Sequence, residues 1–332
     1  MGTVYNFSVY VEDSAGYKSE IYTLNETTLS ITLADVCSSG NNLASCITNY
    51  HNSYGSDITN IYYHTSSLAN SAGDNSYRYS GANPNNYVCF GSDVSPCPSD
   101  NLYRIIGVFG NEVKLIKADY TTTAMTGTGG DYYGAYSYST SNYQGSMSTG
   151  NIASYYWNRN RSNTWSESAL NTTNLNSSYL SYIGSAWSNL IATHSWKVEG
   201  ATLDNVYNGT PQTAYNYEVG SNSSSTTYSA KIGLMYASDY GFAASNSYWT
   251  STLGSYNNTN VRNNNWMWMG LYEWTISRSS DTSNYAFIVP YTGYVYRNNV
   301  NDYNAVRPSF YLNSSVTYAG GTGEASNPIR VN

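Results

Sequence analysis

The stretch "YVYRNNVNDYNAVRPSFYL", Tyr294 to Leu312, changes character halfway along. Its first half is mainly tyrosine and asparagine, whereas its second half, "AVRPSFYL", has the composition of a buried strand that begins near an arginine and a proline. Antibody loops use the same tyrosine-rich mixture for contact, because tyrosine offers a large amphipathic surface and asparagine adapts its hydrogen bonds. The stretch therefore predicts a contact segment that is held directly against a strand of the core.

The sequence before this stretch predicts short strands and short helices separated by turns. Two apolar runs joined by a Gly-Asn turn, Leu102 to Ala118, indicate a hairpin. Apolar residues at helical spacing within Thr164 to Trp196 indicate two or three short helices. A strand over Ile232 to Tyr236 precedes a helix that we expect to be capped at Ser238 or Asp239. The expected fold class is α+β with small mixed and antiparallel sheets.

The composition excludes several classes of partner. Charged residues make up 11% of the 332 residues, against roughly 25% in an average soluble domain. The 38 tyrosines and eight tryptophans supply rigid area to bury, so we expect a folded chain rather than a disordered one. The net charge of −7 disfavours nucleic acid and anionic lipid, and no apolar run approaches the roughly 20 residues of a membrane helix. We expect neither nucleic-acid binding nor membrane insertion.

The N-terminal region predicts a hairpin around the turn Asp13-Ser14-Ala15-Gly16. It resembles the last two strands of an immunoglobulin-like module of bacterial surface proteins. The resemblance implies that the chain begins inside an exported, multidomain bacterial protein whose signal and anchor lie outside it. We expect residues 1–26 to be this hairpin and 27–80 to be a connecting segment with a short helix within Asn41 to Asn52. Residues 81–332 are the main domain.

The four cysteines fall in two close pairs, Cys37 with Cys46 and Cys89 with Cys97. These spacings suit short disulfide-closed loops in an extracellular protein, although four cysteines allow three connectivities. Free thiols in a reducing compartment are the alternative. A metal site would need tighter spacings or nearby histidines, and the three histidines are scattered. We expect no metal and no cofactor.

Two further segments carry weaker signals. Asp74 and Arg78 are close enough in sequence for a salt bridge that fixes their loop. Tyr132 to Asn158 contains many Tyr, Ser, Gly, Thr and Asn residues, and we read it as a long loop, either functional or disordered.

Several motifs in the second half resemble one family. "GLYEWT", Gly270 to Thr275, resembles a signature of the formylglycine-generating-enzyme branch of the C-type lectin fold, and "AVRP" stands where that branch places an arginine on its last core strand. Together with "YRIIGV", "IGLMYASDY" and "YWTST", these motifs are similar to a family of cell-surface domains from Gram-positive gut bacteria. The resemblance implies a C-type-lectin-like domain. Relatives of this fold include the variable proteins of diversity-generating retroelements.

The chemistry of that branch does not carry over to this chain. The enzyme uses a pair of cysteines late in its domain, whereas this sequence has none after Cys97. The calcium-binding strings of sugar-binding C-type lectins are also missing, and no nucleophile elbow, zinc motif or phosphate loop occurs. We see no cluster of titratable residues and predict that the protein is not an enzyme. Glu273 and Trp274 are expected to be structural, with Arg307 as the partner of the buried Glu273 carboxylate.

Two segments near the C-terminus are the predicted ligand-binding loops. In the resembled fold, irregular loops before the last strands form one exposed face that varies while the strands hold it in place. We therefore expect binding of glycans or proteins on another cell or on a host surface, with the arginines as anchors. The predicted residues are Tyr256, Asn257, Asn258, Asn260, Arg262, Tyr291, Tyr294, Tyr296, Arg297, Asn298, Asn299, Asn301 and Tyr303.

Two other readings stay open. The chain is rich in tyrosine from end to end, as drift in an A/T-rich genome would make it, and it would then be a structural spacer or stalk of a large surface protein. It would alternatively be an inactive relative of the formylglycine-generating enzyme. Binding predicts that Tyr294, Tyr296 and Tyr303 lie exposed on one face with Tyr256. A spacer predicts that these rings are scattered or buried, and an enzyme predicts a pocket with convergent titratable groups.

Overall fold

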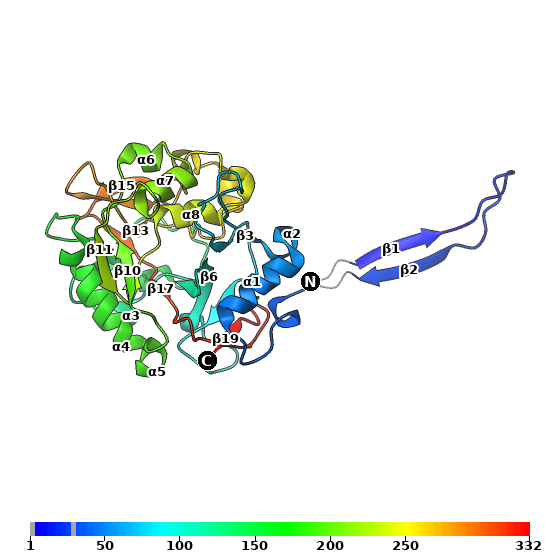
Figure 1. The fold of residues 1–332 in the computed structure, drawn as a ribbon, viewed down its shortest axis with the longest axis horizontal. Coiled ribbons are helices and arrows are strands. Elements are labelled where there is room, and N and C mark those ends of the chain that lie inside the picture. The colour runs from blue at the N-terminus through cyan, green and yellow to red at the C-terminus, as the bar shows by residue number, and fades with distance from the viewer. Residues whose placement is uncertain (1–3, 28–30) are drawn as a thin grey trace.

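The computed structural model describes residues 4–27 and 31–332, and it contains an N-terminal hairpin and a larger body (Figure 1). In the hairpin, β1 (Val4–Val9) pairs antiparallel with β2 (Tyr22–Thr27). The carboxylate of Asp13 accepts hydrogen bonds of 2.9 Å from the backbone N–H groups of Ala15 and Tyr17, which fixes the turn. The predicted hairpin is confirmed. It extends away from the body in Figure 1, and residues 6–25 are exposed.

The larger sheet forms the middle of the body. Its strand order is β12-β17-β7-β6-β5-β19-β18, with β4 added beside β6 and β3 beside β4. The strands are β3 (Ile61–Tyr63), β4 (Tyr77–Tyr79), β5 (Tyr87–Cys89), β6 (Leu102–Phe109), β7 (Glu112–Lys117), β12 (Ile232–Gly233), β17 (Ser309–Tyr311), β18 (Tyr318–Gly320) and β19 (Ile329–Val331). The predicted hairpin β6-β7 is present, and Gly110 takes the positive φ of +62° that its tight turn requires. The predicted core strand "AVRPSFYL" supplies β17 beside β7.

A second sheet has the order β15-β14-β13-β16-β9-β8. Its strands are β8 (Tyr132–Ala135), β9 (Ala153–Tyr156), β13 (Glu273–Arg278), β14 (Tyr285–Val289), β15 (Tyr296–Asn299) and β16 (Tyr303–Ala305). The reading of Tyr132 to Asn158 as one long loop is wrong, because β8 and β9 pair with each other and β9 pairs with β16. Tyr155 and Trp157 from this segment are fully buried. A smaller pair joins β10 (His194–Lys197) to β11 (Thr227–Ala230).

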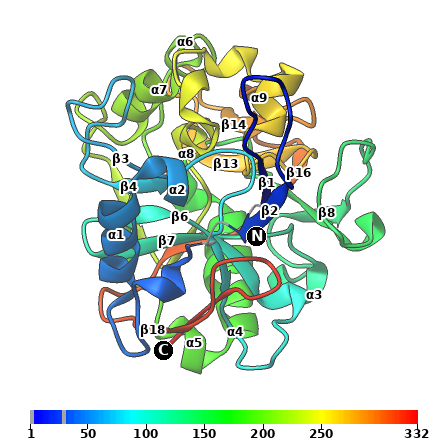
Figure 2. The ribbon, with the colours of Figure 1, turned by 90° about the vertical axis from the view of Figure 1, so that its right-hand side faces the viewer.

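Short helices surround the sheets (Figure 2). They are α1 (Leu43–Tyr54), α2 (Ser56–Thr59), α3 (Thr123–Thr126), α4 (Leu180–Ile183), α5 (Ser185–Ser188), α6 (Leu203–Tyr207), α7 (Pro211–Glu218), α8 (Ala237–Ala243) and α9 (Thr259–Asn263), with a π-helical segment η5 (Leu170–Tyr179) and 3₁₀ turns η1 (Leu33–Asp35), η2 (Ser99–Asn101), η3 (Thr149–Asn151), η4 (Trp165–Glu167), η6 (Asn246–Tyr248) and η7 (Leu253–Ser255). These helices outnumber the two or three expected, but within the described chain only α1 and α7 among the α-helices reach eight residues.

The cap of α8 differs from the prediction. The helix begins at Ala237, after Tyr236 as the N-cap, because the Asp239 carboxylate reaches back to the Tyr236 N–H at 2.9 Å. The strand before it, β12, is correspondingly short. Ser238 and Asp239, the expected cap residues, are thus the second and third residues of the helix, and Asp239 supplies the capping interaction from its third position.

Residues 31–80 belong to the same core as the rest of the body. Ile47 and Tyr50 of α1, Ile61 of β3 and Tyr79 of β4 are buried in one continuous hydrophobic cluster with the larger sheet. β4 pairs directly with β6. Of the connecting segment expected over 27–80, the described residues 31–80 are thus packed together with 81–332. The fold is α+β, with mixed helices and several small sheets.

Candidate functional site

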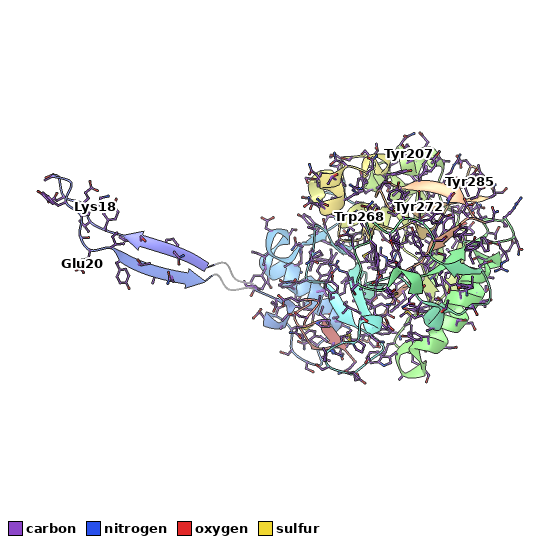
Figure 3. All side chains as sticks on the ribbon, turned by 180° about the vertical axis from the view of Figure 1, so that it is seen from behind. Lys18, Glu20, Tyr207, Trp268, Tyr272 and Tyr285 are labelled. Atoms are coloured by element: carbon purple, nitrogen blue, oxygen red, sulfur yellow. A yellow bond between two sulfur atoms is a disulfide. The ribbon has the colours of Figure 1, made fainter. Side chains whose placement is uncertain are left out.

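A groove lined by tyrosine rings lies at one edge of the second sheet. It encloses about 280 Å³. Its lining consists of Tyr138, Tyr272, Ile288, Pro290, Tyr294, Tyr296, Arg297, Asn298 and Asn304, and we call it the tyrosine groove. Tyr207 and Tyr272, labelled in Figure 3, both lie on the body and far from the hairpin tip marked by Lys18 and Glu20.

The backbone of residues 293–296 explains why the tyrosines face outward. Val295 is fully buried and its N–H donates to the Leu253 carbonyl at 3.0 Å. Because side chains alternate along an extended chain, Tyr294 and Tyr296 on either side of Val295 point away from the core. β15 then continues from Tyr296 in antiparallel register with β14, which places Tyr296 opposite Ile288.

The turn before β15 is held by a close contact. Gly293 has a φ of +93°, and a Cβ atom there would lie 2.6 Å from the Cγ atom of Arg262. Its N–H donates to the Pro290 carbonyl at 2.8 Å. A larger residue would have to displace Arg262, so this turn requires glycine both for its backbone angle and for its neighbour.

The tyrosine rings form two series of ring contacts along this face, one of Tyr207, Tyr294 and Tyr296 and one that includes Tyr138, Tyr272 and Tyr303. Tyr207 of α6 lies 5.3 Å from Tyr296 and 6.3 Å from Tyr294, measured between ring centroids. Further along, Tyr138 lies 5.1 Å from Tyr272. The remaining pairs in this second series are Tyr272 with Tyr291 at 5.4 Å, Tyr138 with Tyr303 at 5.0 Å, Tyr303 with Tyr133 at 3.5 Å and Tyr133 with Tyr156 at 5.5 Å. Contacts of this kind hold each ring in place and leave part of it available.

Some of the rings on this face are exposed to solvent and others are half-buried. Tyr296 is 40% exposed and Tyr133 is 45% exposed, whereas Tyr291, Tyr294 and Tyr303 are intermediate. Burial raises the pKa of Tyr294, and hydrogen bonds from Ser137, Tyr133 and Tyr138 lower the pKa of Tyr303. The Tyr294 phenol therefore stays protonated near neutral pH, and its hydroxyl group can donate and accept hydrogen bonds.

Asn304 gives the groove an unsatisfied polar group. Its backbone pairs with Tyr155 of β9, and its side chain is fully buried. Neither the Nδ2 nor the Oδ1 atom has a hydrogen-bond partner among the described residues. Leaving a buried donor or acceptor unpaired costs about 1–3 kcal/mol. Asn304 also belongs to the lining of the groove.

Arg297 is not a free anchor. Its Nη1 atom donates to the Asp281 carboxylate at 2.9 Å and to the Ser279 hydroxyl at 3.2 Å. Its guanidinium also lies 5.0 Å from the centroid of the Tyr285 ring. The charge of Arg297 is thus neutralised by Asp281, and the groups that the groove offers to a ligand are aromatic rings and amides.

The other predicted residues of this segment lie at the far end of β15. Asn299 accepts a hydrogen bond from the Asn284 side chain at 3.2 Å. Asn301 is half-buried in the turn between β15 and β16, where Val300 is fully buried. These residues continue the face beyond the groove without lining it.

The first predicted loop divides into three parts. Tyr256 is wrong as a binding residue, because it is fully buried and its hydroxyl donates to the Gly241 carbonyl at 3.1 Å. Asn257, Asn258 and Asn260 are exposed, and Asn258 caps α9. Arg262 turns toward the second predicted loop, where its Nη1 atom donates to the Thr292 carbonyl at 3.3 Å.

A separate cavity of about 170 Å³ collects titratable groups, of which the sequence predicted only the pair of Asp74 and Arg78. The Asp239 carboxylate accepts from Lys114 at 2.6 Å and from Arg78 at 3.2 Å. The predicted pair of Arg78 with Asp74 is present at 2.7 Å. The expectation that no titratable groups converge is therefore wrong, since these residues come from β4, β7 and α8 and are distant in sequence.

The charges in this cavity neutralise one another. The two cations face two carboxylates, and every pair is buried or nearly so. Burial and the nearby Lys114 lower the pKa of His194 to about 4, so the imidazole is neutral at physiological pH. Ser238 lines the cavity, and its N–H donates to the Glu218 carboxyl group at 2.9 Å. Glu218 also accepts from the Ala237 N–H at 3.2 Å, which ties it to the start of α8, and we read the cluster as structural.

The residues predicted to be structural hold the core. Arg307 donates from Nε and Nη2 to the two carboxylate oxygens of Glu273, at 2.8 and 3.0 Å, and both side chains are buried. The Trp274 indole donates to the Tyr155 carbonyl at 2.8 Å. These contacts connect β13, β9 and the segment before β17.

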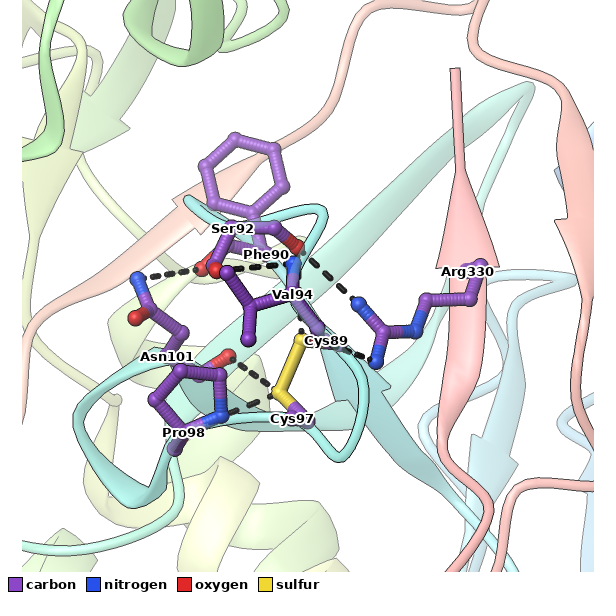
Figure 4. The surroundings of a disulfide bond; sticks show 8 residues. All are labelled: Cys89, Phe90, Ser92, Val94, Cys97, Pro98, Asn101 and Arg330. Carbon is purple, nitrogen blue, oxygen red and sulfur yellow. Dashed lines mark hydrogen bonds between the residues drawn. A yellow bond between two sulfur atoms is a disulfide. The ribbon is translucent and has the colours of Figure 1, made fainter.

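Both predicted disulfides are present, Cys37 with Cys46 and Cys89 with Cys97. Around the second one, Arg330 of β19 donates to the carbonyls of Ser92 and Val94 at 3.0 and 2.8 Å (Figure 4). The loop is thus closed by a covalent bond and attached to the C-terminal strand. The described residues contain no group of three or more His, Cys, Asp or Glu side chains placed to hold a metal ion.

Comparison with known proteins gives no relative. No protein-family model matches the chain, and neither a curated protein nor a solved structure matches it. Within the described residues, no helix is both long and apolar enough to cross a membrane.

Sequence reasoning found one half of the groove and missed the other. Tyr294, Tyr296, Arg297 and Asn298 were predicted, and Asn304 is the last residue of the second predicted loop, 291–304, whereas Tyr138 and Tyr272 were not predicted. Tyr133 and Tyr207 also join the two ring series without having been predicted. The available signal for Tyr133 and Tyr138 was the tyrosine-rich composition of 132–158, and Tyr272 stands inside the "GLYEWT" motif itself.

Proposed function

We propose that the protein is a non-enzymatic binding domain that recognises a glycan or protein ligand through the tyrosine groove. The observation that carries this proposal is the buried, unpaired amide of Asn304 in a groove lined by Tyr138, Tyr272, Tyr294 and Tyr296. Rings held by their neighbours lose little conformational freedom on binding, and the amide gains hydrogen bonds that it lacks in the free protein.

The chemistry of the groove fits sugars and protein loops. The apolar faces of the rings suit the C–H faces of a pyranose or an aromatic side chain, and the phenol and amide groups suit hydroxyls or backbone groups. Because Arg297 is already paired with Asp281, the groove favours a ligand without net charge at this point.

The proposed setting is the outside of a bacterial cell, in a C-type-lectin-like domain that follows an immunoglobulin-like module. Two disulfides support an extracellular location, since such bonds persist mainly in oxidising compartments. The α+β architecture and the order of the "EWT" and "AVRP" motifs support the fold proposal. Neither nucleic acid nor the membrane interior is a proposed partner.

The alternative function is a spacer or stalk. It requires no ligand, and it explains the tyrosines by composition alone. The two series of ring contacts beside the groove and the unpaired amide favour binding, because drift in composition would distribute tyrosines without gathering them on one face. The third proposal is an inactive relative of the formylglycine-generating enzyme. The cavity around Asp239 supports it only in one way, because its mutually neutralised charged groups would then be the remnant of an active site.

The test is a glycan and protein array probed with matched variants. One variant carries serine at Tyr294, Tyr296 and Tyr303. The control variant carries serine at Tyr17, Tyr182 and Tyr217, which are exposed elsewhere. We expect the first variant to lose the array signals and the control to keep them. Equal signals from both variants, or no signal from the unmodified protein, would reject the groove as a binding site.

A second variant separates binding from folding. Asn304→Leu replaces the unpaired amide by an apolar group of similar shape, so we expect thermal stability to be unchanged or higher. Binding should nevertheless fall at least tenfold, because the donor and acceptor for the ligand are gone. If Asn304→Leu unfolds the protein, the amide is a structural group and the argument for the groove fails.

A further inference from the structure

A second open cavity, of about 330 Å³, is lined in part by Arg262, which contacts the turn that precedes β15. Arg262 reaches this turn through its hydrogen bond to the Thr292 carbonyl, and its side chain lines the cavity. Arg104 of β6, Trp266, Trp268, Asn83 and Gln144 are also in the lining. None of the lining residues is shared with the tyrosine groove, so the two sites can be tested separately.

Arg104 brings a buried positive charge to this cavity. The residue is only 6% exposed, and its guanidinium lies between the rings of Tyr87 and Trp266, 4.3 and 4.6 Å from their centroids. Its hydrogen bonds go to uncharged oxygens, including Asn86 Oδ1 at 2.7 Å and the Pro84 carbonyl at 3.1 Å. The rings and these oxygens fix the guanidinium but do not neutralise its charge.

Arg262 adds a second positive charge with unused donor capacity. Its Nη2 atom donates to the Thr259 hydroxyl at 3.2 Å, and its guanidinium lies 5.1 Å from the centroid of the Trp268 ring. The Nε atom of Arg262 and the indole Nε1 atom of Trp268 are buried without a hydrogen-bond partner among the described residues. Two donors in the same cavity are thus unsatisfied.

No carboxylate compensates these two charges. Within residues 4–27 and 31–332, neither Arg104 nor Arg262 forms an ion pair. Asp119 and Arg104 both line a neighbouring cavity, but the two do not form an ion pair, and the Asp119 carboxylate accepts hydrogen bonds from the Tyr143 hydroxyl and from the Tyr120 and Ser146 N–H groups. Burial lowers the pKa of Arg104 to about 10, which still leaves it protonated at neutral pH.

A buried cation without a counter-ion is costly, and an anionic ligand removes that cost. Guanidinium groups match carboxylates in shape and bind them by charge-assisted hydrogen bonds. The volume is at the lower end of the range for ligand sites and suits a single sugar unit. Trp268 can pack against a pyranose face. Because the Asn83 amide oxygen accepts from Arg104 and the Gln144 amide nitrogen donates to the Asn142 carbonyl, hydroxyl groups of the ligand would meet the Asn83 amide nitrogen as a donor and the Gln144 amide oxygen as an acceptor.

We propose that this cavity binds an acidic monosaccharide unit, with its carboxylate directed at the guanidinium groups of Arg104 and Arg262. The ligand class is a sugar acid of the uronate type, free or within a glycan. This site does not depend on the tyrosine groove.

The test is titration of the whole protein with galacturonic acid and with its methyl ester, followed by NMR or calorimetry. We expect the acid to bind and the ester to bind at least tenfold more weakly, because the ester has the same ring without the charge. Acetate should bind more weakly than galacturonic acid, because it lacks the ring and the hydroxyl groups. Equal binding of acid and ester, equal binding of acetate and acid, or no binding of the acid would overturn the proposal.

Amino-acid substitutions test whether galacturonic acid binds in this cavity. Arg262→Gln removes one charge and should weaken galacturonic acid at least tenfold, whereas Arg297→Gln, in the tyrosine groove, should not. Trp268→Ala is the second variant, because it removes the ring and leaves the hydrogen bond of Arg262 to Thr292 in place. Unchanged binding in both Arg262→Gln and Trp268→Ala contradicts the assignment. Tyr296→Ser should leave galacturonic acid binding unchanged, which separates this site from the groove.

Discussion

The rings of Tyr133 and Tyr303 stack with their centroids 3.5 Å apart and their planes 6° apart. Tyr133 belongs to β8, and Tyr303 belongs to β16 on the other side of β9 in the same sheet. The stack therefore connects the tyrosine-rich segment 132–158 to the C-terminal segment that precedes the core strand. It forms one end of the second ring series, which continues toward the tyrosine groove.

A double-mutant cycle measures this connection. Tyr133→Ala, Tyr303→Ala and the double variant should give a coupling free energy of about 0.5–1.5 kcal/mol in urea unfolding, as for other aromatic pairs. The cycle of Tyr133→Ala with Tyr17→Ala, an exposed tyrosine of the hairpin, should give no coupling. A coupling of zero for the first pair would show that the stack contributes nothing to stability.

The buried pair of Glu273 and Arg307 should be sensitive to the loss of one partner. Glu273→Met leaves the guanidinium of Arg307 buried without a counter-ion, and we expect a loss of about 3–5 kcal/mol in the free energy of unfolding. Glu273→Met combined with Arg307→Met should cost less than Glu273→Met alone. In comparison, Glu199→Gln breaks a half-exposed pair with Arg278 and should cost less than about 1 kcal/mol.

Tyr256 should affect stability and not binding. Tyr256→Phe removes the hydrogen bond to the Gly241 carbonyl and should cost about 1 kcal/mol. Tyr256→Ser opens a cavity in the core and should cost about 3–5 kcal/mol. Tyr296→Ser, at a 40% exposed site, should change stability by about 0.5 kcal/mol or less while it weakens ligand binding. Lost binding by a folded Tyr256→Phe variant would contradict this division.

Glu218 should make stability depend on pH. Burial raises the pKa of its carboxyl group to about 7, although the N–H groups of Ala237 and Ser238 donate to it. Because the folded protein holds this proton more tightly than the unfolded chain, the contribution of Glu218 is fully present below pH 4.5 and is lost as pH rises through 7. A shift of this size corresponds to roughly 3 kcal/mol.

Glu218→Gln provides the control for that pH dependence. The variant cannot ionise at this position. The unfolding free energy of the wild type, measured relative to that of Glu218→Gln, should therefore fall between pH 5 and pH 8. Urea unfolding at several pH values measures it. A difference that stays constant across this range means that Glu218 does not titrate there.

The sequence by itself determined the local features. Alternating apolar residues with a Gly-Asn turn predicted β6 and β7, and the short cysteine spacings favoured the two disulfides. The composition of "AVRPSFYL" predicted a core strand, and a buried carboxylate at Glu273 required a cation such as Arg307. These features depend on residues that are neighbours in the sequence, or on the need of a buried carboxylate for a cation, which few residue types can supply.

Only the tertiary structure decided which tyrosines share a face. The direction of a side chain depends on strand register, so Val295 is buried while Tyr294 and Tyr296 face outward, and Tyr256 is buried in a loop of similar composition. Tyr138, Tyr272 and Asn304 reach the groove because β16 pairs with both β9 and β13 across long sequence separations. Composition gives the number of rings, but sheet pairing gives their arrangement, because hydrogen bonds between distant strands set the positions of the side chains.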